Sequence, residues 1–132
     1  MNQNNNRWKQ RFSEFQKALK SLEKALMVKD PDEIYRAGII QYFEMTFELA
    51  WKSLKDYLFE QGFDPKTPRQ TIQQAFRSEI IEDGHVWIDA LEMRNMIAHT
   101  YDENHAKDVE KLIRNNYFSF LKALEAYFLK KL

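Results

Sequence analysis

Apolar side chains in this sequence recur every three or four residues almost from end to end, and this spacing constrains the fold more than any other feature. Such a period places the apolar side chains on one face of an α-helix. No stretch of useful length alternates apolar and polar residues, as a strand with one buried face would. We therefore expect an all-α protein without a sheet. The first stripe consists of Trp8, Phe12, Phe15, Leu19, Leu22 and Leu26.

Start and stop signals divide this pattern into helices. In residues 30–33, Asp-Pro-Asp-Glu, Asp30 reads as an N-cap followed by a proline at the first helical position. Gly62 is placed to end the second helix. Thr67 and Gln70 have the spacing of a capping box, which predicts the start of a third helix.

Two further signals complete the expected architecture. Asp83 is predicted to cap a helix that ends around residues 98–101, and Asn104 is predicted to cap the last helix. Four to five helices with short connections favour an antiparallel up-and-down bundle. We expect a disordered polar tail over residues 1–6 and one helical domain over residues 7–132.

The balance of charges limits the possible functions. The 20 Lys and Arg residues match the 20 Asp and Glu residues, which argues against bulk electrostatic binding to nucleic acid but leaves room for a local basic site. Without cysteine, neither a disulfide nor a thiolate zinc site can form. No stretch approaches the roughly 20 apolar residues that span a bilayer, and the start does not resemble a signal peptide. We expect a cytoplasmic protein without a membrane partner.

Residues 94–101 gather polar groups where the helical pattern requires apolar ones. On a helical wheel, Arg94 falls in the middle of the apolar face, where a guanidinium needs a carboxylate or a ligand anion. Asn95 and His99 are four residues apart, so the amide could orient the imidazole. Arg94 and His99 are five residues apart and converge only if the arginine side chain wraps or the helix loosens.

This trio suits phosphodiester chemistry. Histidine transfers protons near neutral pH, and arginine binds a phosphate through two parallel hydrogen bonds. RNA supplies its own nucleophile, the 2′-hydroxyl, so no metal is required. In the structural alternative, Arg94 is a core arginine paired with Glu44 or Glu48, and His99 is favoured by the helix dipole. Spacing alone leaves both interpretations open.

The same residues carry a family resemblance. Residues 94–101, Arg-Asn-Met-Ile-Ala-His-Thr-Tyr, match the Arg-x4-His-x-Tyr signature of HEPN domains. Residues 43–52, Phe-Glu-Met-Thr-Phe-Glu-Leu-Ala-Trp-Lys, resemble the branch of nucleotidyltransferase substrate-binding proteins. The resemblance covers nearly the whole chain. It implies a bundle that dimerises about a two-fold axis and brings two motifs into one cleft, which in active relatives is a metal-independent ribonuclease.

The resemblance also implies residue roles and partners. Arg94 would bind the scissile phosphate of RNA, His99 would act as general acid or base, and Asn95 would orient the histidine or the RNA. A small nucleotidyltransferase antitoxin would use ATP to attach AMP to Tyr101 and so neutralise this toxin, which itself needs no cofactor. The alternatives are a non-catalytic substrate-binding subunit of the transferase and a plain helical interaction protein.

Other polar features have simpler interpretations. We expect Glu44 to lie near Arg94 as a supporting residue and leave the role of Glu48 open. The single Glu-x-x-His at residues 82–85 lacks the second copy that a carboxylate-bridged metal bundle needs, so we predict no metal site. The tryptophans Trp8, Trp51 and Trp87 are expected in the core or at an interface rather than as stacking platforms for bases. Four cations are interpreted first as solvated surface and only second as an RNA path: Lys52, Lys55, Arg69 and Arg77.

Overall fold

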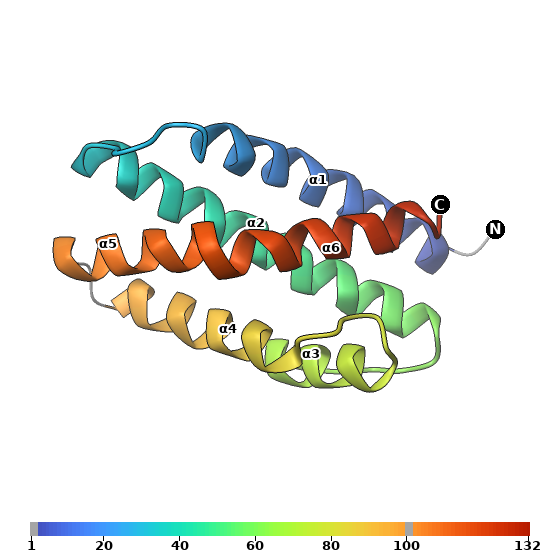
Figure 1. Ribbon diagram of the computed structural model, residues 1–132. Coiled ribbons are helices and arrows are strands. Elements are labelled where there is room, and N and C mark those ends of the chain that lie inside the picture. The colour runs from blue at the N-terminus through green and yellow to red at the C-terminus, as the bar shows by residue number, and fades with distance from the viewer. Residues whose placement is uncertain (1–2, 100–101) are drawn as a thin grey trace.

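Six α-helices and one π-helical turn make up the regular structure of residues 3–99 and 102–132, the part of the chain that the computed structural model describes. In chain order these are α1 (Gln3–Ala25), α2 (Glu33–Glu60), α3 (Pro68–Arg77), α4 (Gly84–His99), α5 (Glu103–Leu112), the π-helical turn (Ile113–Tyr117) and α6 (Phe118–Leu129). Figure 1 shows α1, α2, α4 and the continuous α5–α6 rod running side by side, with the short α3 at one end. The predicted all-α bundle is confirmed.

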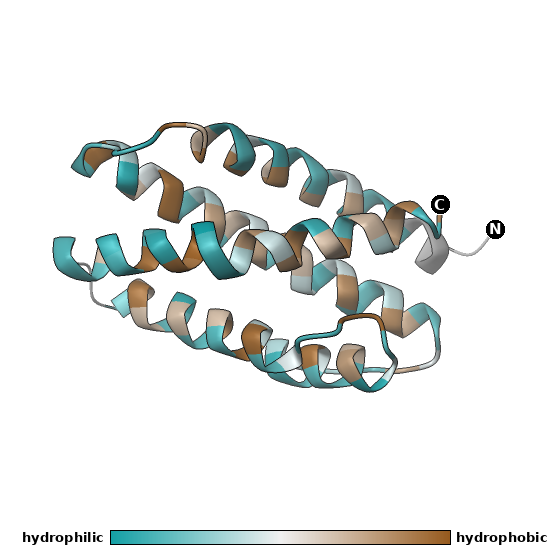
Figure 2. Cartoon of the chain, in the orientation of Figure 1, coloured by the Kyte–Doolittle hydropathy of each residue, from teal (hydrophilic) through white to brown (hydrophobic). Residues whose placement is uncertain are grey.

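One hydrophobic cluster fills the space between the helices. The three tryptophans belong to it, as predicted, with exposed fractions of 2%, 9% and 1% for Trp8, Trp51 and Trp87. Figure 2 shows hydrophilic residues along the outward side of α1 and hydrophobic residues turned toward the neighbouring helices. Ring pairs link the helices, such as Trp8 with Phe128 at 5.1 Å between centroids and Trp87 with Phe120 at 4.3 Å. Much of the aromatic content therefore serves the core.

Helix ends follow the local chemistry of the sequence. Thr67 accepts a hydrogen bond from the Gln70 N–H at 3.1 Å and caps α3 as predicted. Gly62, with φ of 98°, ends α2. Its N–H donates to the Phe59 carbonyl at 3.1 Å and the Phe63 N–H donates to the Leu58 carbonyl at 2.9 Å, the pair of bonds that defines a Schellman motif.

Two predicted caps are wrong. Asp30 has φ of 52°, whereas an N-cap needs an extended backbone. Asp32 has that backbone and accepts from the Tyr35 N–H at 2.7 Å. Asp102, not Asn104, caps α5. The first helix, α1, begins at Gln3, within the stretch of residues 1–6 for which a polar tail was expected.

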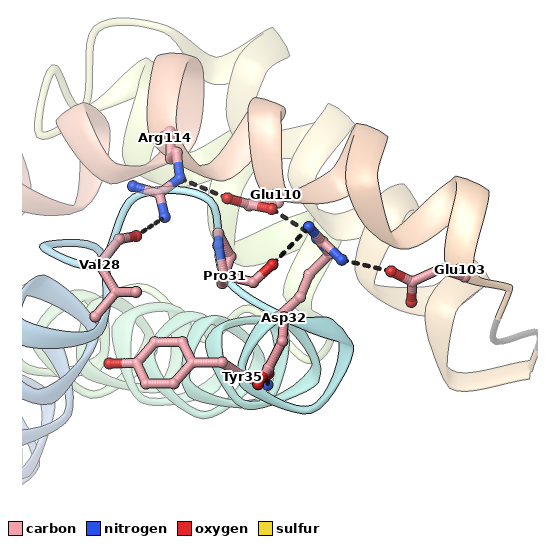
Figure 3. A network of polar contacts seen from close by, with 8 residues as sticks. Val28, Pro31, Asp32, Tyr35, Glu103, Glu110 and Arg114 are labelled. Atoms are coloured by element: carbon pink, nitrogen blue, oxygen red, sulfur yellow. Dashed lines mark hydrogen bonds and ion pairs between the residues drawn. The ribbon is translucent and has the colours of Figure 1, made fainter.

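Two arginines and two glutamates join distant segments at one end of the bundle (Figure 3). Arg36 on α2 donates to Glu110 at 2.7 Å, to the Pro31 carbonyl at 2.9 Å and to Glu103. Arg114 donates to the second oxygen of Glu110 at 2.8 Å and to two carbonyls after α1, including that of Val28 at 2.7 Å. This network fixes the start of α5, directly after the motif segment.

Candidate functional site between α2 and α4

Arg94 lies on the inner side of α4, near the end of that helix, and reaches across to α2. Its Nη1 donates to Oε2 of Glu48 in an ion pair, and its Nη2 donates to Oδ1 of Asn95 at 3.2 Å. The Arg94 side chain is 23% exposed and that of Glu48 is 34% exposed. The carboxylate expected beside a guanidinium in this position is therefore present, at a place that solvent still reaches.

Glu48 is the most heavily bonded group of the site. Besides Arg94, it accepts from the indole Nε1 of Trp51 at 3.0 Å and pairs with Nζ of Lys52 at 3.1 Å. Burial alone would raise the pKa of Glu48, but the hydrogen bonds from Trp51 and Lys52 and the charge of Arg94 outweigh burial and lower it. Glu48 is ionised at neutral pH.

Glu44 lies one helical turn before Glu48 on α2. Burial raises its pKa, and the nearby charge of Arg94 opposes that rise. Glu44 was expected to lie near Arg94 as a supporting residue. Among the described residues, however, the ion pair with Arg94 is formed by Glu48, whose role the sequence left open. Glu44 is thus a second, partly buried carboxyl group that feels the charge of Arg94.

The other predicted site residues are placed less tightly. His99 is exposed and is the last residue of α4. None of the hydrogen bonds formed among the described residues joins His99 to Asn95, whose amide oxygen instead accepts from Arg94. Tyr101, the predicted modification site, lies outside the described residues. The structure therefore brings together Arg94, Asn95 and the two glutamates, with His99 at the end of the same helix.

Two of the four cations considered for an RNA path are in ion pairs, Lys52 with Glu48 and Arg69 with Glu92 at 3.4 Å. In residues 3–99 and 102–132, no group of three or more His, Asp or Glu side chains is placed to hold a metal ion. Across the same residues, none of the helices has the length and apolar character needed to cross a membrane.

The guanidinium of Arg94 determines which ligands the site can bind. Arginine has five N–H donors in a fixed plane, and two of them are used by Glu48 and Asn95 within the described part of the chain. Counted over those residues, three donors remain to bind an anion. A phosphate bound to Arg94 would lie close to the end of the helix that also carries His99. Histidine is the side chain most often used for proton transfer in catalysis.

The role of Glu48 was left open, although the sequence contains a signal for it. Glu48 is followed by Trp51 three residues later and Lys52 four residues later, which are the spacings at which side chains on a helix meet. A buried indole needs a hydrogen-bond acceptor. A glutamate that satisfies it is fixed on the helix surface, and it becomes the better partner for an arginine on a facing helix.

Comparison with known proteins identifies the family. The family model described as "Nucleotidyltransferase substrate binding protein like" matches residues 10–130. The chain belongs to this family. It is therefore a HEPN-superfamily protein of the nucleotidyltransferase substrate-binding branch, as the two motifs predict.

Individual relatives agree with this assignment. The HEPN chain is 32% identical over 78 residues to a protein of Haemophilus influenzae named "Probable ribonuclease HepT", an alignment that covers 55% of this chain and 53% of the relative. The match thus spans about half the length of that curated relative.

Two solved structures share the fold. A crystal structure of ttk003001694 from Thermus thermophilus has a TM-score of 0.78 and 28% identity, covering 83% of this chain and 94% of the other. HI0074 of Haemophilus influenzae has a TM-score of 0.75 and 25% identity, covering 87% and 96%. That structure is described as the fold of a substrate binding domain of a nucleotidyltransferase.

Proposed function

We propose that this HEPN chain is a metal-independent ribonuclease that acts as the toxin partner of a small nucleotidyltransferase. One observation carries the proposal: acceptors on α2 and α4 hold the guanidinium of Arg94 at a solvent-accessible place, with three N–H donors left for a phosphate among the described residues. His99 ends the same helix five residues later. The name of the Haemophilus relative supports the same activity.

The reaction needs only groups that RNA, this site and solvent water supply, with water as the partner in the proton transfer that His99 does not carry out. The 2′-oxygen attacks phosphorus, a base accepts its proton, and the bond from phosphorus to the 5′-oxygen breaks as that oxygen gains a proton. The products are a 2′,3′-cyclic phosphate and a 5′-hydroxyl. Arg94 stabilises the charge on the non-bridging oxygens, and His99 carries out one of the two proton transfers.

Partner and assembly belong to the same proposal. The transferase silences the toxin by linking AMP to Tyr101, which adds bulk and negative charge close to the phosphate site in sequence. Self-association is supported by exposed apolar side chains on the outward face of α2, where Ile34 is 84% exposed and Met45 is 48% exposed. A second copy on this face would bring two sites together.

RNA digestion by the purified chain, with a chelator and without partner, tests the activity. Cleavage should leave 2′,3′-cyclic phosphate ends. Arg94→Ala should lower the rate at least about 100-fold and His99→Ala about 100- to 10,000-fold, with helical content unchanged by circular dichroism. Sedimentation of the same sample reports the dimer.

A second function has its own support, namely the family description and the description of HI0074. In this alternative the chain holds a substrate for the transferase and does not cut RNA. It is favoured if well-folded wild type cuts no RNA, tRNA included, while intact mass shows that Tyr101 carries no adenylate. Cleavage that both variants retain would place the active site elsewhere.

A further inference from the structure

Trp51 gives the site a connection to the rigid core. Its ring is buried, with 9% of the residue exposed, and its Nε1–H donates to Oε2 of Glu48 at 3.0 Å. An indole held by core packing has a donor in a fixed position, because interior side chains are close-packed and occupy single rotamers. The Oε2 atom of Glu48 therefore has a fixed position as well.

The same oxygen receives Arg94. Oε2 of Glu48 accepts from Nη1 of Arg94 as well as from Trp51, while Lys52 lies 3.1 Å from the other oxygen. The second orienting bond, from Nη2 of Arg94 to Asn95, comes from α4 itself. A long arginine side chain is thus held from two helices, although 23% of it is exposed.

We propose that Glu48 is the positioning residue of the site, which transfers the fixed position of Trp51 to the guanidinium of Arg94. The consequence is that the remaining N–H donors of Arg94 meet a phosphodiester in one orientation. This consequence rests on the proposed function. A phosphate binds arginine best through two parallel N–H bonds, and these require the plane of the guanidinium to be set in advance.

In the opposite role, Glu48 would compete with the phosphate for Arg94. If Glu48 competes with the phosphate, removing its carboxylate should let Arg94 bind anions more tightly. If Glu48 positions Arg94, removing its carboxylate should weaken both binding and cleavage. The two roles therefore differ in the sign of the effect of Glu48→Ala.

The first measurement concerns the guanidinium alone and does not depend on catalysis. In protein labelled with ¹⁵N-arginine, the Arg94 resonances are assigned by their loss in Arg94→Lys. Wild type should show separate Nη resonances because rotation of the Arg94 guanidinium is hindered. In Glu48→Ala the guanidinium of Arg94 should rotate at least about tenfold faster. Glu92→Ala is the matched control, because Glu92 pairs with Arg69 in an ion pair between α3 and α4 that does not include Arg94. Equal rotation in wild type and Glu48→Ala overturns the proposal.

The second measurement separates turnover from binding. Glu48→Ala should lower kcat for RNA by about 10- to 100-fold, change KM less, and add no further loss to Arg94→Ala, because both act through one group. Glu48→Gln, which keeps an oxygen acceptor, should recover part of the rate. Binding of an uncleavable 2′-deoxy oligonucleotide is measured in parallel, and tighter binding by Glu48→Ala contradicts positioning. If wild type cuts no RNA, the proposed function fails, while the Arg94 resonances still decide the role of Glu48.

Discussion

At the scale of single residues, Glu79 occupies a backbone conformation that usually belongs to glycine. Its φ is 60°, and it follows the C-cap of α3 just as Gly62 follows that of α2. The Glu79 N–H donates to the Phe76 carbonyl at 3.0 Å and the Ile80 N–H donates to the Ala75 carbonyl at 2.9 Å, so α3 also ends in a Schellman motif. A side chain in this left-handed region costs about 1 kcal/mol relative to glycine.

Glu79→Gly should therefore stabilise the protein by about 1 kcal/mol, seen as a higher urea midpoint with an unchanged m-value. Glu82→Gly is the matched control, since Glu82 is an exposed glutamate in the same connection whose φ is not positive. It should be neutral or destabilising, because glycine there only adds freedom to the unfolded chain. Equal effects of the two substitutions would mean that strain at Glu79 is absent.

The site shows what residue patterns can predict. The sequence placed Arg94 on an apolar face and called for either a carboxylate or a ligand anion beside it, and in the structure the carboxylate of Glu48 pairs with it. It favoured Glu44 and left Glu48 open, whereas the ion pair is formed by Glu48, one turn further along the same helix. Which glutamate faces Arg94 depends on how far α2 and α4 are rotated and shifted relative to each other. This arrangement is set by the packing of all the side chains between the two helices.

At the scale of elements, the last helix contains a wide turn that no sequence signal marked. Residues 113–117 form a π-helical turn without glycine or proline, and the apolar spacing through it suits an ordinary α-helix equally well. Within this turn, fully buried Tyr117 donates its hydroxyl to Asp89 of α4 at 2.5 Å. Burial and the neighbouring carboxylate raise the pKa of Tyr117, so the phenol stays protonated. This bond ties the last helix to the helix that carries Arg94.

Tyr117→Phe removes that bond and keeps the shape of the ring. We expect a loss of about 1–2 kcal/mol in the free energy of unfolding. The lost hydrogen bond goes to a carboxylate, but the Asp89 carboxylate can still be hydrated in the variant. Urea denaturation followed by circular dichroism measures it. Tyr42→Phe, at a tyrosine that is 40% exposed, should change stability by less than about 0.5 kcal/mol. Equal losses would show that the Asp89 contact contributes nothing specific.

At the scale of the whole molecule, the arginine–glutamate network joins segments that the sequence gives no reason to pair. Arg36 and Glu110 are 74 residues apart, and Arg114 reaches 88 residues back to the Leu26 carbonyl. The all-helical fold, the order of the helices and the burial of the tryptophans could be predicted, because each follows from local spacing, whereas the division of the last helix into α5, the π-helical turn and α6 could not. A pairing of charges between helices could not, because opposite charges on many surface positions satisfy the same pattern until the bundle is assembled.

The carboxylate of Glu110 is the centre of that network, and its substitution tests the network as a whole. The Glu110 side chain is 12% exposed. Burial alone would raise the pKa of Glu110, but hydrogen bonds from Arg36 and Arg114 and their charges outweigh burial and lower it below its ordinary value of 4.5. A lowered carboxyl pKa in the folded state stabilises the fold above pH 4.5, and this stabilisation is lost as the pH falls through the folded-state pKa.

Glu110→Gln should therefore cost on the order of 3 kcal/mol at pH 7, because two guanidinium groups lose their shared counter-charge. The difference from wild type should shrink below about pH 4, where wild-type Glu110 is itself becoming protonated. Urea denaturation at pH 7, 5 and 3.5 measures both effects. Glu92→Gln, in an exposed ion pair with side chains 50% and 64% exposed, should change stability by less than about 1 kcal/mol at any of these pH values. A loss for Glu110→Gln that stays constant with pH would mean that shape, rather than charge, holds this end of the bundle together.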